Sequence, residues 1–356
     1  MQISFDINDV DKHKWDLNIN NNNIFNKYDF LKCYQLNNPS INHVYIISDN
    51  TQFYGHIFTL KLSKTSDYSN YITLIFDLLL RVFPIKFFYC TNSFITNIPS
   101  YVSREVFNLT PIIVKINSLQ KPLVTIIPDF LFENKFCNIN DEFVKMQVED
   151  EMSIVIKDNW RNFNDYKDSL KTKYRKRILI IEKNSNPISI NLLDKEDLIN
   201  YEDKLQLLFK QVLNNSSFIG PTFQIKTFQS LISLYENINI FGYFLDNKIV
   251  AFSCEIEHNN YLYSYFVGFD YKINKSHSLY ARILCESINS AILKNKKELI
   301  LGRTANEFKS NFGAIAKKSS VYIKVNNYFL RLLLNIFIKR VNFKNKIYRN
   351  PFKKVD

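Results

Sequence analysis

Alternating apolar and polar positions in the second half of the chain predict three consecutive β-strands, at residues 238–245, 248–258 and 261–270. Two polar pairs separate these strands, Asp246-Asn247 and Asn259-Asn260. Asn and Asp tolerate the left-handed backbone of tight hairpin turns, so each pair is typical of a β-turn. The pattern therefore predicts an antiparallel meander.

The spacing of apolar residues changes after the meander. Residues 271–278 are polar and predict a loop, whereas 278–293 place one apolar stripe on a helix. The stripe consists of Leu279, Ile283, Leu284, Ile288 and Ile292. A strand at 298–301, a short helix at 304–311 and a strand at 321–325 follow. The order β-β-β-α-β-α-β indicates an α/β fold, of the α+β type with a mixed sheet.

The first half of the chain repeats part of this pattern. A hairpin at 44–62 that turns at Asp49-Asn50 matches the hairpin at 242–256. A helix candidate and a strand at 85–90 follow, as a helix and the strand at 298–301 do in the second half. The first copy lacks a recognisable third strand and a clear second helix. We therefore expect a duplication with a degenerate first copy.

A helical region joins the two halves. Residues 160–181 carry an apolar stripe with a basic opposite face, and 198–212 and 223–235 are two further amphipathic candidates. The loop 216–221 separates the latter two. The domain boundary is expected near 148–158. The predicted domains are 1–150, then 151–345 with a helical insertion, then a basic tail at 346–356.

Charge is concentrated at the C-terminal end of the chain. The formal net charge is +12, and residues 314–356 hold eleven basic residues and one acid, Asp356. A basic surface of this kind favours anionic partners, namely phosphates, tRNA or a lipid surface; a solvated tail is the alternative. Residues 328–338 are apolar but too short to cross a bilayer, and are expected to form a buried helix or to lie on a membrane.

Cysteine and histidine usage argues against disulfides and metals. Five scattered cysteines form no CxxC pair, and five histidines form no HExxH motif. The N-terminus is polar, with no signal-peptide pattern, and the apolar stretch 71–89 is interrupted by charged residues and Pro84. We expect a cytoplasmic protein, in which peripheral contact with the inner face of the membrane is an option.

The segment 301–314, LGRTANEFKSNFGA, carries two of the chain's six glycines. Thr304 and Glu307 have the spacing of a helix capping box. Gly313 is expected to adopt positive φ at a helix end, and Gly302 to allow a sharp turn or a close backbone approach. Arg303 comes at the carboxyl end of a strand, where α/β sheets bind ligands; an internal salt bridge is the alternative.

The start of the helix predicted at 279 also combines basic residues with residues that can cap a helix. Lys272 and Lys275 flank its entry, and Ser276 or Ser278 is placed to cap it. Free helix amides beside lysines form a plausible phosphate site. No glycine-rich cradle is present in this loop.

Five segments together resemble the GNAT acyltransferase superfamily. They are KYRKRI (173–178), GYFLDNKIVAF (242–252), VGFDYKINKSHSLY (267–280), LGRTANEFKSNFGA (301–314) and RNPFK (349–353). In particular, the chain resembles bacterial GNAT-like peptidoglycan biosynthesis proteins, which are related to Fem-type aminoacyltransferases. The resemblance implies two GNAT-like domains, with the C-terminal one complete. It also implies transfer of an acyl or aminoacyl group from acyl-CoA or aminoacyl-tRNA to an amine, such as a cell-wall precursor.

Such a transfer needs a group that handles protons and stabilisation of an oxyanion. Lys309, Asp270 and Tyr280 are the candidates for catalytic groups, each with a structural role as the alternative. Arg303, Lys275, Ser276 and Ser278 are the candidates for donor binding. The candidates for substrate binding are Tyr174, Arg175, Arg177 and Phe218. No metal is expected.

Two other functions remain open at this stage. One is a non-catalytic binding module that has kept the fold, because no histidine base and no glycine loop stand in the motif segments. The other is a protein that binds an anionic membrane or nucleic acid through the basic C-terminus, although no motif for sequence-specific nucleic-acid binding is present.

Overall fold

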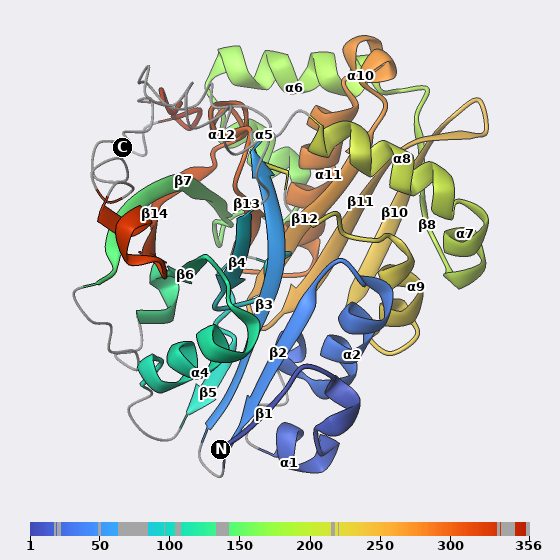
Figure 1. The fold of residues 1–356 in the computed structure, drawn as a ribbon. Coiled ribbons are helices and arrows are strands. Elements are labelled where there is room, and N and C mark those ends of the chain that lie inside the picture. The colour runs from blue at the N-terminus through green and yellow to red at the C-terminus, as the bar shows by residue number, and fades with distance from the viewer. Residues whose placement is uncertain are drawn as a thin grey trace. The chain divides into compact units, whose positions relative to one another are not determined.

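The computed structural model has a mixed α/β fold, as predicted (Figure 1). It describes residues 1–17, 19, 23–48, 51–62, 85–95, 97–103, 108–132, 142–214, 218–219, 221–332, 335 and 346–353. The chain forms two compact units. The first contains residues 1–149, 216–223 and 318–344, and the second contains residues 150–215, 224–317 and 345–356.

The second unit is built on a mixed sheet. Its strands follow the order β7 (Val144–Val155, of which 152–155 pair here), β13 (Glu298–Gly302), β12 (Tyr261–Phe269), β11 (Lys248–His258), β10 (Ile238–Leu245) and β8 (Ser189–Leu192). Neighbouring strands are antiparallel except β12 and β13, which are parallel. The predicted meander is confirmed, and Asp246, Asn247 and Asn259 have the positive φ expected of its turns.

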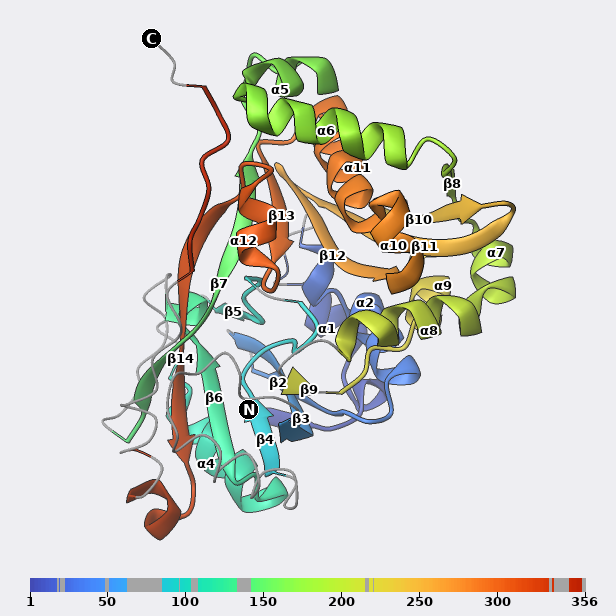
Figure 2. The same cartoon turned by 90° about the horizontal axis from the view of Figure 1, so that it is seen from above.

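Helices cover both faces of this sheet (Figure 2). On one face lies α11 (Leu279–Leu293), with α5 (Phe163–Ser169), α6 (Thr172–Asn184) and α10 (Tyr271–His277) beside it. On the other face lie α7 (Lys195–Asn200), α8 (Glu202–Leu213) and α9 (Lys226–Ile232). A short helix, α12 (Asn306–Ser310), follows β13. The apolar stripe predicted for α11 is buried along its whole length, as its spacing required.

Three local predictions need correction. The helix expected at 160–181 is two helices, because Leu170 has extended backbone and pairs with Phe352 in an isolated bridge. The loop expected at 271–278 is the helix α10, whose first amides are capped by the Asp270 side chain. The capping box of Thr304 and Glu307 is absent, since Thr304 has positive φ whereas a capping residue needs extended backbone.

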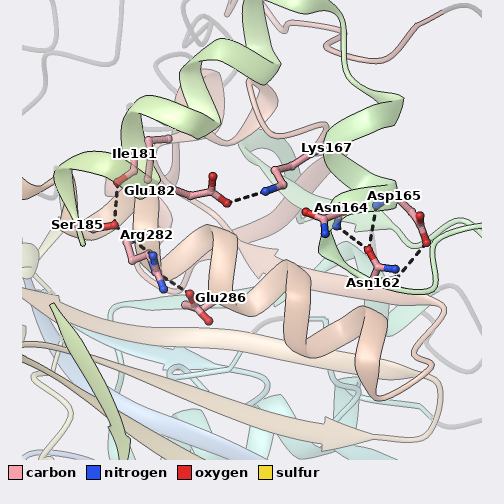
Figure 3. A network of polar contacts seen from close by, with 9 residues as sticks. All are labelled: Asn162, Asn164, Asp165, Lys167, Ile181, Glu182, Ser185, Arg282 and Glu286. Carbon is pink, nitrogen blue, oxygen red and sulfur yellow. Dashed lines mark hydrogen bonds and ion pairs between the residues drawn. The ribbon is translucent and has the colours of Figure 1, made fainter. Parts of the chain in front are cut away.

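Polar contacts fix α6 against α5 and α11 (Figure 3). Lys167 of α5 donates to Glu182 of α6 at 2.9 Å. Arg282 of α11 lies against Ser185, just past the end of α6, with 3.3 Å between Nη1 and Oγ. Arg282 also pairs with Glu286 one turn further along α11, at 2.6 Å. These contacts determine which side of α6 faces the protein.

The strands of the first unit are also paired in a mixed parallel and antiparallel arrangement. Its strands follow the order β1 (Gln2–Ser4), β2 (Asn42–Ile47), β3 (Thr51–Leu62), β4 (Ile85–Tyr89), β6 (Val124–Pro128) and β14 (Ile315–Val325, of which 321–325 pair here). Only β4 and β6 are parallel neighbours. Two short strands, β5 (Tyr101–Ser103) and β9 (Phe218–Ile219), also pair with β3. The strand expected at 321–325 is therefore confirmed, but its partner is β6 of the first half.

Helical segments of the first unit precede and follow these strands. They are η1 (Ile7–Asp9), α1 (Lys12–Asp16), η2 (Ile24–Asn26), α2 (Tyr28–Asn37), α4 (Thr110–Gln120) and η3 (Asp129–Phe132). Ile112, Ile113 and Ile116 of α4 are buried against the sheet. Between parallel strands β4 and β6, α4 has the place that α11 has between β12 and β13.

The two units thus repeat one order of elements. A strand and helices precede three antiparallel strands, and a helix then leads to a strand parallel to the third. The strand at 85–89 is the third antiparallel strand of the first copy and does not correspond to 298–301 as expected from sequence. After its parallel strand β13 the second unit has α12, and in the first unit the described residues directly after β6 form the 3-10 helix η3.

Several predicted features fall outside the described residues. These are the turn at 49–50, the helix candidate before residue 85, and most of the basic segment after residue 332. Within the described part of the chain, none of the helices combines the length and the apolar character needed to span a bilayer.

A row of buried polar side chains crosses strands β2 and β3 of the first unit. His43 Nδ1 lies 2.8 Å from the Tyr54 hydroxyl, which also contacts His56 Nε2, and Ser93 N donates to His56 Nδ1 at 3.0 Å. Burial lowers the pKa of His43 to about 4 and the pKa of His56 well below its usual 6.5. Both rings are therefore neutral in the folded unit.

We expect the first unit to lose stability as the pH falls from about 7 to about 4. The unfolded chain takes up protons on both histidines near their usual pKa, whereas the folded unit does not, so acid favours unfolding. For His43 alone the loss should be about 3 kcal/mol. Urea denaturation followed by Trp15 fluorescence, in a Trp160→Phe background that leaves one of the two tryptophans, measures it.

The matched controls are His43→Gln, which should flatten the pH dependence, and exposed His13→Gln, which should not. An unchanged slope in His43→Gln would show that this buried row does not cause the acid sensitivity.

Candidate functional site

The parallel strands β12 and β13 separate at their carboxyl ends. They pair only from Tyr261/Glu298 to Tyr263/Ile300, while β12 continues to Phe269. The register between β11 and β12 shifts in the same place, because β12 has an extra residue between Ser264 and Val267. The two strands therefore share no ladder pair beyond Tyr263 and Ile300. The carboxyl ends of parallel strands are a common place for ligands to bind in α/β sheets.

The turn after β13 has an unusual backbone. Gly302, Thr304 and Ala305 all have positive φ, of 68°, 71° and 50°. The sequence predicted a sharp turn or a close approach at Gly302, and the structure has both. The positive φ of Gly302 belongs to the turn, and a Cβ atom there would lie only 3.0 Å from the Tyr265 ring. Positive φ is costly for the β-branched Thr304. Such strained turns persist only where surrounding contacts hold them, and they are frequent at functional sites.

Lys309 supplies those contacts. Its buried Nζ donates to the carbonyl oxygens of Leu301, Gly302 and Arg303 at 2.8, 3.2 and 2.8 Å. An ammonium group has three N–H donors, so these three carbonyls can use all of them. The position favours a structural role for Lys309, in which it fixes the turn, over the catalytic role considered from sequence.

Arg303 lies next to a buried carboxylate. Its Nε is 2.9 Å from Oε1 of Glu151, which is 3% exposed on β7, while the Arg303 side chain is 20% exposed. The structure therefore places Arg303 in the internal salt bridge that the sequence left as the alternative to ligand binding. The sequence did not indicate Glu151 as the partner, because the pairing of β7 with β13 brings Glu151 close to Arg303.

An aromatic stack lies across the ends of β12 and β13. The ring of Tyr280, at the start of α11, stacks on Phe269 of β12 at 5.5 Å and on Phe308 of α12 at 5.4 Å. The guanidinium of Arg177, on α6, lies 5.2 Å from the centre of the Phe308 ring. Two predicted residues, Tyr280 and Arg177, are thus brought together through Phe308, which sequence reasoning missed.

Tyr280 is a neutral phenol under ordinary conditions. Burial raises its pKa well above the usual 10, and the nearby Tyr271 adds to the rise. Its backbone N–H donates to the Asn274 side chain at 2.9 Å. A neutral phenol can donate a proton or hydrogen bond to a group bound at the strand opening.

The remaining catalytic candidate, Asp270, and the remaining donor-binding candidates, Lys275, Ser276 and Ser278, lie on α10 and at its ends. Asp270 is the N-terminal cap of α10 and accepts from the amides of Lys272 and Ile273. Lys275 is exposed. Ser276 contacts His277, and Ser278 has positive φ with its side chain near Asn184. Capping of α11 comes from Asn274, and not from a serine as expected.

The substrate-site candidates are dispersed. Tyr174 packs half-buried against the core of the second unit, and exposed Arg175 pairs with Asp168 at 3.2 Å. Phe218 belongs to the first unit, where β9 pairs with β3. Of the predicted residues, Lys309, Arg303, Tyr280 and Arg177 surround the strand opening or its aromatic stack. No cluster of His, Cys, Asp or Glu suited to a metal occurs among the described residues.

No protein-family model matches the chain, and no curated protein matches it. Among solved structures, the chain is similar to FemX, with 11% identity over 94% of this chain and 100% of that chain, and a TM-score of 0.48. It is also similar to L-PGS from Bacillus licheniformis, with 10% identity over 85% and 90% and a TM-score of 0.47.

A conserved protein of unknown function from Bacteroides thetaiotaomicron VPI-5482 has 10% identity over 89% of this chain and 93% of that chain, with a TM-score of 0.47.

Replacing Lys309 by Met should destabilise the second unit by about 3 kcal/mol, because it leaves carbonyl groups of the turn without their charged donor. Urea denaturation followed by circular dichroism and Trp160 fluorescence measures the change. Lys275→Met, at an exposed position, is the matched control and should change the free energy of unfolding by less than about 0.5 kcal/mol. Equal stability of the two variants would contradict the role of Lys309 in the turn.

Proposed function

We propose that the chain is an N-acyltransferase that moves an activated acyl or aminoacyl group to an amine. The observation that carries the proposal is the separation of β12 and β13, with the neutral phenol of Tyr280 stacked between Phe269 and Phe308 at the opening. In this proposal the acyl carbonyl binds at the strand opening, and Tyr280 donates a proton to the leaving group, as acyl transfer from an ester or thioester requires.

The reaction proceeds through a tetrahedral intermediate. The acyl carbonyl lies at the edge of β12 beyond Tyr263, and the acceptor amine attacks its carbon. The amide bond forms, the bond to sulfur or oxygen breaks, and the leaving group takes a proton from the Tyr280 hydroxyl. The phenolate recovers a proton released by the attacking nitrogen, through water, so that protons balance over the cycle.

Two donors are consistent with this site, acyl-CoA and aminoacyl-tRNA. The first-turn amide of Tyr280 is already used by Asn274, and the loop before α11 has no glycine cradle. Both features disfavour a pyrophosphate seat at the start of α11, so we favour an aminoacyl ester as the donor. The acceptor is proposed to be an amine of a cell-wall or cell-envelope precursor, and the site of action the cytoplasm or the inner face of the membrane.

A binding module without turnover is the second candidate. It is favoured by Arg303 and Lys309, whose charged groups contact protein groups in the internal contacts described above. The two candidates differ in what Tyr280 does. In a binding module its hydroxyl contributes to affinity alone.

Thermal-shift measurements with free CoA, acetyl-CoA, longer acyl-CoAs and mixed aminoacyl-tRNA identify the donor, and mass spectrometry of reactions with simple amines detects the product. Stabilisation by at least one donor is expected, since a ligand that binds only the folded state raises its stability. No stabilisation and no product from any donor would contradict the proposal.

With the donor identified, Tyr280→Phe should lower kcat about a hundredfold and leave donor affinity nearly unchanged, because it removes the proton donor and keeps the aromatic stack. Tyr261→Phe is the matched control, since Tyr261 is exposed at the end of β12 opposite to Phe269 and the stack. A Tyr280→Phe variant with the control's kcat would exclude Tyr280 as the proton donor.

A further inference from the structure

The side of α6 that faces away from the second unit has a distinctive composition. Here the outer face of α6 means the exposed residues Thr172, Lys173, Lys176, Leu179, Ile180 and Lys183. At 100° per residue they occupy one arc of the helix, opposite the buried Ile178, Ile181 and Ser185. The face therefore combines three lysines with two large aliphatic side chains and no acid.

The orientation of this face is fixed by contacts on the other side of the helix. The single acidic residue of α6, Glu182, points to Lys167 of α5, and Ser185 accepts a hydrogen bond from Arg282 of α11 (Figure 3). Ile178 and Ile181 belong to the core cluster shared with α11. Rotation of the helix would break these contacts, so the outer face stays outward.

The aliphatic pair is the unusual part of this face. Leu179 and Ile180 are 50% and 57% exposed, and they lie between Lys176 and Lys183 along the helix. Arg175 and Arg177 flank the arc, although Arg175 is paired with Asp168 and Arg177 lies over Phe308. Neighbouring exposed aliphatic residues ringed by cations are typical of helices that lie in a membrane interface.

We propose that the outer face of α6 docks the protein onto an anionic lipid surface. The lysines contact lipid phosphates, while Leu179 and Ile180 enter the boundary between headgroups and acyl chains. An RNA backbone would satisfy the lysines equally well but would leave the aliphatic pair exposed to water, so charge and apolar area together favour lipid. The inference does not depend on the proposed acyl transfer.

Vesicle flotation with the full chain tests this docking. Vesicles of phosphatidylcholine alone should not retain the protein, whereas vesicles with about one third phosphatidylglycerol should. Lys176→Gln with Lys183→Gln should weaken binding to the anionic vesicles roughly thirtyfold. Leu179→Asn with Ile180→Asn should weaken it about tenfold even at low salt, where the lysines act most strongly.

The matched controls change the same residue types on other exposed helical positions of the second unit. They are Lys195→Gln with Lys204→Gln, and Ile199→Asn with Leu207→Asn, and both pairs should bind as the unchanged protein does. Circular dichroism checks that each variant is folded. The effects of variants and controls on vesicle binding are independent of any transferase assay.

Three outcomes would overturn the proposal. The first is equal binding to neutral and anionic vesicles, and the second is full binding by the Leu179 and Ile180 variant. The third is tighter binding to RNA than to anionic vesicles, with RNA binding lost in the lysine variant and retained in the aliphatic variant. That last result would assign the face to nucleic acid instead.

Discussion

The candidate site depends on one buried ammonium group. The three carbonyls that Lys309 binds belong to the last two residues of β13 and to Arg303 directly after it, and the two residues that follow have positive φ. Without a cation at their centre, these oxygens would be oriented together with no donor to offset their repulsion. With it, β13 ends in a fixed turn, and β12 continues to Phe269, beyond the last pair that it forms with β13. The opening between the strands is therefore maintained by a contact within the protein.

The aromatic stack uses the opening that this turn creates. Phe269 ends β12, Tyr280 begins α11, and Phe308 lies on α12 one residue before Lys309. The same short helix thus presents a lysine inward to the turn and a phenylalanine to the stack. Arg177 extends the stack to α6, so the helix whose outer face we propose to meet lipid also touches the edge of the candidate site. The geometry of the turn after β13 and the position of α6 are therefore linked through Phe308 and Arg177.

The first unit repeats the order of elements of the second unit, so it also has one parallel strand pair that corresponds to β12 and β13. There β4 and β6 are the parallel neighbours, and the described residues directly after β6 form the 3-10 helix η3. The buried side chains of that unit differ in character, since neutral His43 and His56 lie with Tyr54 across β2 and β3. The common order therefore does not carry common chemistry, because function depends on the residues placed on a fold.

Local properties of this chain could be predicted from its sequence. The meander at 238–269, the buried stripe of α11 and the positive φ of Gly313 all follow from periodicity or from the freedom of glycine, which involve residues close along the chain. The helix α10 was missed because its residues carry no apolar stripe, and none of them is buried. The stacking of Phe308 on Tyr280 could not be predicted, because in the sequence Phe308 is simply an apolar residue on a short predicted helix.

The tertiary structure alone determines which groups contact the charged side chains and which strands pair with one another. Glu151 reaches Arg303 because β7 pairs with β13, and residues 321–325 pair with β6, far away in sequence. Strand register and the end of pairing between β12 and β13 are likewise not encoded by any local pattern. The physical reason is that a charged side chain or a strand edge is satisfied by whichever group the fold brings near it. Periodicity reports which face is buried, but not what lies against it.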